Sequence, residues 1–367
     1  MSAVQISGKR IAGVDALRGL AAIAVLLYHV TLRPTPLVPL GFAGVEVFFC
    51  ISGFILAYAY EDKLDAGMSA GSYAVQRWLR LYPLYALGLV FGLVVYLAGA
   101  AVNGSANPPA AAAVAFVKGV FLIPIFTPFT IGDGPYLFQT ALFPYDNPAW
   151  SLLIEAVCSV VFFFWRPRGL SLTATLAGLA ALLFGCILAT DHLGGGDQAT
   201  FLNGYPRGFF CFYAGLAVYR VWRAGWLETL PRSTLAALAL LAFGAMCKLS
   251  SLVYFAIVFV GAPWLVVLAT AKPGSRRLER LYLWLGDISY PLYMIHVPLS
   301  VLVRLVAVSC GLWSVAEPSP RWASLALLPL SLAVSWLVAK AYDEPARRWL
   351  TRQIFLRPLV IKSRPAV

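Results

Sequence analysis

Three ionisable side chains, Asp15, Arg18 and His29, lie in one apolar run, residues 11–32, where a lipid-facing helix would carry none. At 100° per residue, the steps of three and eleven residues between them keep all three on one side of a helix, with His29 roughly 16 Å above Arg18. Because an arginine at membrane depth is costly, this stripe is expected to face protein or a wet cavity. A neutral histidine there can act as a general base on a hydroxyl, which predicts a catalytic site. The plainer alternative is a structural Asp15–Arg18 ion pair beside a hydrogen-bonded histidine.

A second pair of polar residues, Arg77 and Arg80, opens the apolar run that continues to about residue 101. They are one helical turn apart, so both guanidinium groups can project to one side. Arginine binds phosphate through two parallel hydrogen bonds, so this pair is a candidate phosphate site. Anchoring to lipid head groups is the alternative.

A hydroxyl and a carboxylate, Ser151 and Glu155, share one face of the apolar run that begins at Trp150. A buried carboxylate is either protonated or paired, so Glu155 needs a partner. His29, at a similar predicted depth, is the expected one.

Polar residues near the end of the chain fall into two further groups. Ser289, Tyr290, Tyr293 and His296 lie on one face at mid-membrane, and a structural network of interhelical hydrogen bonds is the favoured interpretation. Asp343 and Glu344, followed by Arg347 and Arg348, are expected to form a local ion-pair cluster at the end of the last span. His192, in a glycine-rich loop, is expected to be solvated.

These groups need a membrane-embedded scaffold, and the composition supplies one. The 367 residues are 60% hydrophobic and only 12% charged, whereas a soluble domain is nearer a quarter charged. The fold class is therefore all-α: a polytopic transmembrane helix bundle in a single integral domain. The net charge of +12 does not indicate nucleic acid, because the basic residues follow the loops and form no patch with interleaved aromatics. The six cysteines show no metal-ligand spacing and are expected to pack between helices.

About ten membrane spans are predicted, with the basic residues of the loops gathered on one side. The positive-inside rule then places both termini in the cytoplasm and the protein in the plasma (inner) membrane. The apolar segment 110–128 contains Lys118, Pro124 and Pro128, so it is interpreted as re-entrant or interfacial. One integral membrane domain would cover residues 1–345, with a basic cytoplasmic tail at 346–367. The predicted spans are residues 11–32, 41–60, 77–101, 150–166, 170–190, 208–222, 234–247, 252–271, 283–308 and 324–342.

The chain resembles the membrane acyltransferase 3 family, which O-acylates sugars and other hydroxyl acceptors, over nearly its whole length. Five motifs in the same order, at matching depths, are a specific signal, although each alone is weak. They are Arg18 and His29; Glu46 with Phe48-Phe49 and Ser52-Gly53-Phe54; Arg77, Arg80 and Pro83; Trp150, Ser151, Leu152 and Glu155; and Ser289, Tyr290, Tyr293 and His296.

The resemblance implies that His29 is the catalytic histidine, that Arg18 supports it, and that Arg77 with Arg80 engages an acyl-CoA donor, commonly acetyl-CoA. Two departures concern the donor end: Gln76 stands where many relatives carry another arginine, and the usual late E-x-P reads Asp343-Glu344-Pro345.

The expected function is transfer of an acetyl or short acyl group from acyl-CoA to a hydroxyl of a cell-surface or exported glycan. His29 would deprotonate the acceptor or carry the acyl group covalently, and Glu155 would orient the acceptor or the histidine. Asp15 belongs to the same catalytic group. The acceptor or supporting residues are expected to be Glu46, Ser52, Trp150, Ser151, Tyr293 and His296.

The expected partners are acyl-CoA as a substrate, a glycan or lipid-linked sugar as acceptor, and membrane lipid. No metal, bound cofactor or nucleic acid is expected. One alternative is an acyltransferase for a small secondary metabolite such as a macrolide. Another is a proton-coupled transporter or flippase, because intramembrane Asp, Arg, Glu and His also suit a proton path. The two halves show no matching broken helices, which disfavours the transporter.

Overall fold

The computed structural model of the chain is almost entirely helical. It describes residues 10–31, 36–131, 141–190, 194–246, 257–314 and 320–355. Helices make up 77% of the structure, and the described residues contain no strand beyond one isolated bridge between Ala141 and Asp197. The all-helical fold class predicted from composition is confirmed.

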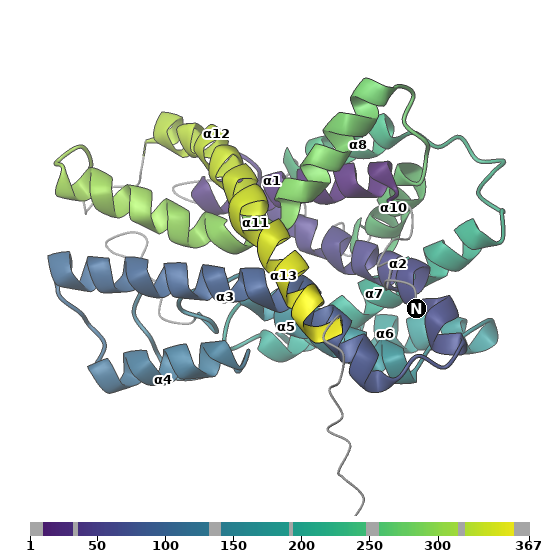
Figure 1. The fold of residues 1–367 in the computed structure, drawn as a ribbon, viewed down its shortest axis with the longest axis horizontal. Coiled ribbons are helices and arrows are strands. Elements are labelled where there is room, and N and C mark those ends of the chain that lie inside the picture. The colour runs from purple at the N-terminus through teal and green to yellow at the C-terminus, as the bar shows by residue number, and fades with distance from the viewer. Residues whose placement is uncertain are drawn as a thin grey trace, which may run out of the picture.

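The helices differ widely in length, from single 3-10 turns to two helices of 34 residues (Figure 1). In chain order they are α1 (Ala12–Val30), η1 (Gly41–Ala43), α2 (Gly44–Asp65), α3 (Ala70–Asn103), α4 (Pro109–Val120), α5 (Ala149–Phe164), α6 (Leu170–Thr190), η3 (Phe201–Asn203), α7 (Gly204–Arg223), α8 (Thr234–Met246), η4 (Ile257–Gly261), α10 (Ala262–Ala269), α11 (Arg276–Ser309), α12 (Arg321–Val338), η5 (Ala339–Asp343) and α13 (Glu344–Phe355).

Six helical stretches of the described chain are long and apolar enough to cross a membrane: 12–30, 41–65, 70–103, 170–190, 276–309 and 325–354. The predicted count of about ten is not confirmed. The helix α5 has 16 residues, short of the roughly 20 that a perpendicular crossing needs. The predicted spans 234–247 and 252–271 run into residues 247–256, which lie outside the described residues. The helix α7 has 20 residues but carries three arginines. The chain is thus a multi-pass membrane protein whose central elements include several shorter apolar helices.

The helix α1 lies inside the bundle and packs most extensively against α11, while α2 packs mainly against α7 (Figure 1). Small residues allow these close approaches. A Cβ at Gly19 would lie 2.6 Å from Leu285, and one at Gly53 would lie 1.8 Å from the Phe212 carbonyl oxygen. Cys50, Cys158 and Cys211 are buried as free thiols in this core, as the packing interpretation predicted, whereas Cys186 is partly exposed and Cys310 is exposed.

The segment after α3 turns back on itself, as predicted for residues 110–128. The 12 residues of α4 span only about 18 Å. The Asn107 side chain donates to the Thr130 carbonyl at 2.7 Å and accepts from the Thr130 amide at 2.8 Å, so the segment returns to the end where it began. That this segment does not span stays a prediction, which its short helix and its return support.

Ion pairs join the C-terminal ends of α2, α5 and α7. Glu61 accepts from Arg168 at 3.0 Å and from Arg220 at 2.8 Å, and Asp62 accepts from Arg223 at 2.7 Å. These ends therefore lie together, as the predicted topology requires of residues assigned to one side.

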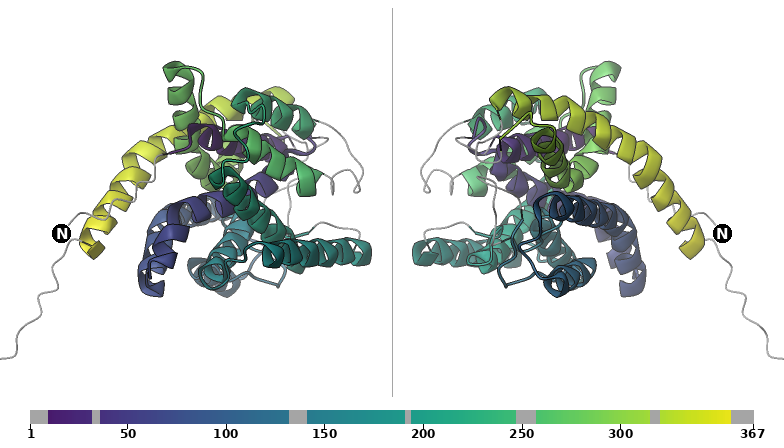
Figure 2. Two further views of the ribbon diagram at one scale, coloured as in Figure 1. Left: turned by 90° about the vertical axis from the view of Figure 1, so that its right-hand side faces the viewer. Right: turned by 90° about the vertical axis from the view of Figure 1, so that its left-hand side faces the viewer.

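The last helices, α12, η5 and α13, continue one another along a bent path that leaves the body of the molecule (Figure 2). The predicted local cluster is present here: Arg347 donates to Asp343 at 2.6 Å, and Glu344 pairs with Lys340 and Arg348. The domain boundary at residue 345 stays a prediction and falls inside α13, which begins at Glu344.

Candidate active site

The N-terminal half of α1 is held against α11 by Arg18. Its Nη2 donates to Asp15 at 3.0 Å and to the Gly286 carbonyl at 3.1 Å, and its Nε donates to Ser289 at 2.9 Å. Asp15 also accepts from Arg10 at 2.7 Å. The predicted Asp15–Arg18 ion pair is therefore present, and its residues are shared with α11.

Glu155 on α5 is paired with Arg77 on α3. The Arg77 Nη2 donates to Glu155 Oε1 at 3.0 Å, and the Ser52 hydroxyl donates to the same oxygen at 2.8 Å. The expectation that His29 would be its partner is wrong. Glu155 lies one helical turn further along α5 than Ser151, which brings its carboxylate to the first part of α3, whereas His29 lies at the far end of α1.

Arg80 is the cation in this region that has no ligand in the described chain: it makes no hydrogen bond or ion pair with any described residue. Its charged neighbours are Arg18, Arg347, Asp15 and Asp343. With three arginines against two carboxylates, the group carries net positive charge. An anion is the ligand that such a group favours.

Arg18, Arg77 and Arg80 line one small cavity of about 110 Å³. Both Arg77 and Arg80 reach it, as their spacing of one turn predicts. Hydroxyl and aromatic side chains complete its wall. The lining residues used below are Arg18, Phe48, Ser52, Arg77, Arg80, Ser151, Glu155, Ser289, Tyr290 and Tyr293.

His29 lies at the other end of α1 and does not contact Arg18. Its Nδ1 is 3.0 Å from the Val25 carbonyl oxygen and 3.1 Å from Nε2 of His296 on α11. The two rings lie with their centroids 5.0 Å apart. The histidine predicted to be catalytic is thus hydrogen-bonded to the histidine predicted to be structural.

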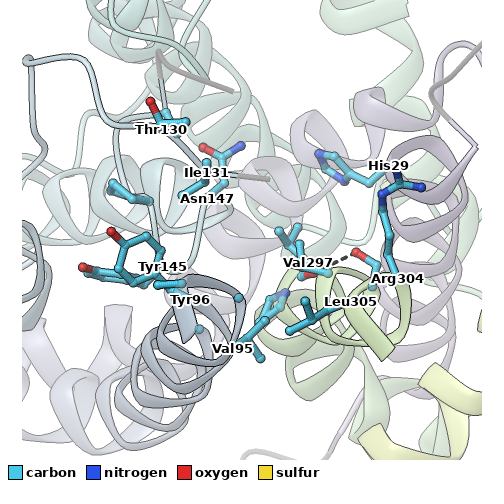
Figure 3. A pocket seen from close by; sticks show the side chains of 18 of the residues that line it. His29, Val95, Tyr96, Thr130, Ile131, Tyr145, Asn147, Val297, Arg304 and Leu305 are labelled. Carbon is cyan, nitrogen blue, oxygen red and sulfur yellow. Dashed lines mark hydrogen bonds between the residues drawn. The ribbon is translucent and has the colours of Figure 1, made fainter. Parts of the chain in front are cut away.

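A larger cavity of about 500 Å³ opens beside His29 (Figure 3). The side chains of His29 and Asn147 face each other across it (Figure 3). Tyrosines and polar side chains from distant parts of the chain line it together with apolar residues. They include Tyr28, Tyr96, Asn107, Thr130, Tyr145, Asp197 and Arg304.

A layer of side chains separates the two cavities. Tyr293 lines the smaller cavity, and its hydroxyl is 2.7 Å from that of Ser151. The Tyr293 ring is 5.0 Å from Phe48 and 6.0 Å from His296. The single polar stripe expected on α1 therefore serves two cavities, with Arg18 at one and His29 at the other.

The predicted hydrogen-bond network on α11 is present. Ser289 accepts from Arg18, the Tyr290 hydroxyl donates to the Leu81 carbonyl at 2.6 Å, and Tyr293 and His296 bond as described above. Each of these contacts crosses to another helix. His192 lies outside the described residues.

Glu46 is fully buried and pairs with Arg207 on α7. Arg207 lies 5.5 Å above the Trp150 ring and donates to the Gly194 carbonyl at 2.5 Å. Gly195 has φ +108° and packs against Trp150, where no side chain would fit. Because Gly196 lines the larger cavity, this group holds part of that cavity's wall.

Sequence reasoning missed Arg207, which lies between the predicted spans 170–190 and 208–222. The signal was present in Glu46: an acid in an apolar run requires a cation, and Arg207 precedes a long apolar segment. Asn147 was missed because an amide next to a proline in a loop is typical of turns.

Asp146, beside Asn147, is completely buried, and neither of its carboxyl oxygens has a hydrogen-bond partner among the described residues. Burial raises the pKa of this carboxyl well above its usual range. A Cβ added at Gly88 would lie 2.9 Å from Asp146 Oδ2 and 3.0 Å from the Met294 carbonyl oxygen. Burial therefore favours the protonated, uncharged form of this carboxyl.

The sequence matches the acyltransferase 3 family, described as an acyltransferase domain, over residues 11–340. The described His, Cys, Asp and Glu side chains form no metal-binding group. No solved structure matches the chain.

Three curated proteins are similar to it. Protein 2 in the picA locus of Rhizobium radiobacter is 33% identical over 164 residues, which cover 42% of this chain and 81% of that protein. The putative peptidoglycan O-acetyltransferase YrhL of Bacillus subtilis is 26% identical over 80% of this chain and 49% of its own length. The peptidoglycan O-acetyltransferase OatA of Listeria monocytogenes is 22% identical over 93% and 56%. The chain thus spans about half the length of the two O-acetyltransferases.

Proposed function

This chain belongs to the acyltransferase 3 family, and from that premise we propose that it moves an acetyl or short acyl group from acyl-CoA to a glycan hydroxyl. The protein is a membrane O-acyltransferase; the donor, the acceptor and the roles of individual residues are the proposal. The observation that carries it is the pair of cavities along α1, one lined by arginines and the other by His29.

The arginine-lined cavity is the proposed donor end. Coenzyme A carries phosphate groups, and Arg80 is a cation with no hydrogen-bonding ligand among the residues that the structure describes. Arg77 is paired with Glu155 and Arg18 with Asp15, so these two arginines contribute positive potential and form the cavity wall. The N–H groups of Arg80 are the ones that can donate to a phosphate. Guanidinium groups bind phosphate bidentately, which a lysine cannot do.

The larger cavity is the proposed acceptor end. Its volume of about 500 Å³ falls in the range of small-ligand sites. Tyr28, Tyr96 and Tyr145 offer flat apolar surface, and Asn107 and Asn147 offer amide groups. Alternating aromatic and amide groups suit a sugar, which has apolar ring faces and hydroxyl edges. The relatives named as peptidoglycan O-acetyltransferases support a cell-wall or exported glycan as the acceptor.

His29 is the proposed general base. It takes the proton of the acceptor hydroxyl on its ring nitrogen, while the hydroxyl oxygen bonds to the thioester carbon. When the carbon–sulfur bond breaks, the proton passes to the departing thiolate, giving coenzyme A and an ester. Atoms and charge balance without any further reactant. The acyl carbon reaches His29 when the side-chain layer of Phe48 and Tyr293 parts to join the two cavities.

Asn147 is the proposed donor to the oxyanion that forms during this step. Its side chain faces His29 across the cavity (Figure 3), and its Oδ1 is buried without a hydrogen-bond partner among the described residues. An amide N–H aimed at the reacting carbonyl oxygen stabilises the tetrahedral intermediate, and losing one such donor costs about 10²–10³ in rate.

The orientation follows from these assignments. Coenzyme A is a cytoplasmic metabolite, so the donor end, with the start of α1, faces the cytoplasm of the plasma (inner) membrane. The positive-inside distribution of the loops supports the same orientation, with both termini inside.

The test is acyl transfer in isolated membranes supplied with acetyl-CoA labelled in its acetyl group. We expect base-labile label on membrane or periplasmic glycan, and we expect replacement of His29 by Ala to abolish it. The variant His192→Asn removes the third histidine of the chain and is the matched control. Full labelling by an equally expressed His29→Ala protein would reject the proposal, as would solute flux with no labelled acceptor.

A further inference from the structure

We propose that His296 sets the tautomer of His29, so that the two imidazoles act as one hydrogen-bonded pair of which only His29 meets the acceptor. This inference rests on the proposed function, because it assigns His296 a positioning role in the same reaction. It gives His296 a purpose beyond the structural network that its spacing predicted.

The first observation is where the two rings lie. His29 lines the larger cavity, whereas His296 lines neither cavity and is 1% exposed. Its Nε2 lies 3.1 Å from the Nδ1 of His29. A substrate in the cavity therefore touches His29, and His296 acts through it.

The second observation is the set of acceptors around each Nδ1. The Nδ1 of His296 lies 3.0 Å from the Leu292 carbonyl oxygen and 2.9 Å from that of Tyr293. Carbonyl oxygens only accept hydrogen bonds, so this nitrogen carries the hydrogen. In the neutral ring, Nε2 of His296 is then an acceptor.

The same reasoning fixes the protonation of His29. Its Nδ1 faces two acceptors, the Val25 carbonyl oxygen at 3.0 Å and the Nε2 of His296 at 3.1 Å. A hydrogen on Nδ1 satisfies both contacts. The Nε2 of neutral His29 is therefore left with a lone pair, which is the form that a general base at the cavity requires.

The contact with His296 can also stabilise the positive charge that His29 gains during the reaction. No described carboxylate bonds to either ring, so the arrangement differs from triads in which a carboxylate holds the histidine. When His29 takes a proton on Nε2, its Nδ1–H becomes a stronger donor to His296. The added charge is thus shared through a charge-assisted hydrogen bond, and the proton count of the pair rises by one.

The competing explanation is that His296 simply ties α11 to α1. These two helices already pack along much of their length, with Gly19 against Leu285 and Arg18 bonded to Ser289. A tie that serves packing alone would change stability slightly and leave turnover intact. The two roles therefore differ in what the variants should do to kcat.

The first experiment compares two replacements of His296 in the labelled acetyl-CoA assay. His296→Leu fills the space without an acceptor, and His296→Gln presents an amide oxygen where Nε2 lay. We expect the Leu variant to lose about 10²-fold in kcat with an unchanged KM for acetyl-CoA, since it spoils general-base catalysis. We expect the Gln variant to recover to within about tenfold of the parent. Thermal unfolding in detergent checks that both variants fold.

A Leu variant with kcat near the parent value would overturn the inference, and so would a folded Gln variant as slow as the Leu variant. If His29→Ala is inactive while His296→Leu is fully active, the positioning role fails and the proposed function stands. If neither variant affects transfer, both fail.

The second experiment needs no activity. The chain has three histidines, so the variant His192→Asn leaves only this pair. Solid-state NMR of the ¹⁵N-histidine-labelled protein at neutral pH should show Nδ1–H on both rings and an unprotonated Nε2 on His29. An Nε2–H signal on His29 would overturn the inference, whatever the acceptor proves to be.

Discussion

Both ends of α1 carry ionisable residues, Asp15 and Arg18 at one end and His29 at the other, and their contacts differ. At the Arg18 end, charges meet in pairs: Arg18 with Asp15 and Arg77 with Glu155, with Arg80 left over. At the His29 end, two imidazole rings lie within hydrogen-bonding distance of each other and of backbone carbonyls. The first arrangement leaves Arg80 available to a ligand. The second, as proposed above, leaves a lone pair on Nε2 of His29.

The difference reflects what each end is proposed to do. Binding an anionic donor needs a fixed charge, and pairing the neighbouring arginines with carboxylates limits repulsion among them. Moving a proton needs a group that changes its protonation during each cycle, which a guanidinium does not do. If this comparison holds, the two ends should respond to mutation in separable ways.

The largest expected effect is the loss of turnover when His29 is replaced. His29→Ala should reduce kcat by about 10³-fold, within the range for a lost general base. The affinity for acetyl-CoA should stay within about twofold of the parent, because the arginine-lined cavity is unchanged. Competition binding in detergent, run beside the turnover assay, measures both. A variant that also loses the donor would show that the two ends are one site.

The next effect concerns the wall of the acceptor cavity. Arg207→Met leaves Glu46 buried without its cation, so the free energy of unfolding should fall by about 3–5 kcal/mol. Titration with a denaturing detergent measures the loss. The double variant Arg207→Met with Glu46→Met should recover most of it, because no unpaired charge remains. A double variant no more stable than the single one would contradict this account.

A smaller effect is expected on donor binding when Arg80 is replaced. Arg80→Met should raise the KM for acetyl-CoA by about 10- to 100-fold, equivalent to a charge-assisted hydrogen bond of about 1.5–3 kcal/mol. Turnover at saturating donor should change little. Arg348→Met is the matched control: this arginine is 75% exposed on α13 and lines neither cavity. Equal effects of the two substitutions would mean that Arg80 has no special role.

The smallest effect concerns Asp146, which lies beside the acceptor cavity and takes part in neither pairing scheme. The pKa of Asp146 is higher in the folded protein than in the unfolded chain. As the pH rises, the unfolded chain therefore loses this proton before the folded protein does. Its contribution to stability is therefore present below the ordinary carboxyl pKa and declines as the pH rises toward the raised value. Thermal unfolding at about pH 5 and about pH 8 should show the protein less stable at the higher pH.

Asp146→Asn keeps the shape of the side chain and removes the titration, so it should flatten this pH dependence. Parallel pH curves for the parent and the variant would show that Asp146 does not titrate in this range.

Several features followed from the sequence because they depend on nearby residues. Hydropathy predicted an all-helical membrane protein, and helical spacing predicted the Asp15–Arg18 pair and the shared side of Arg77 and Arg80. The prolines around α4 predicted a segment that turns back. These properties are set within one helix or one loop, and the periodicity of a single segment contains them.

Only the tertiary structure decided which polar groups meet. His29 and His296 are 267 residues apart in the chain, Glu46 and Arg207 are 161 apart, and Arg77 and Glu155 are 78 apart. Their pairing depends on the depth and rotation of one helix against another. Those are set by close packing at small residues such as Gly19 and Gly53, not by the pattern of either helix alone. For this reason the sequence predicts His29 as the partner of Glu155, whereas the structure pairs it with Arg77. For the same reason the polar side of α1 borders two cavities and not one.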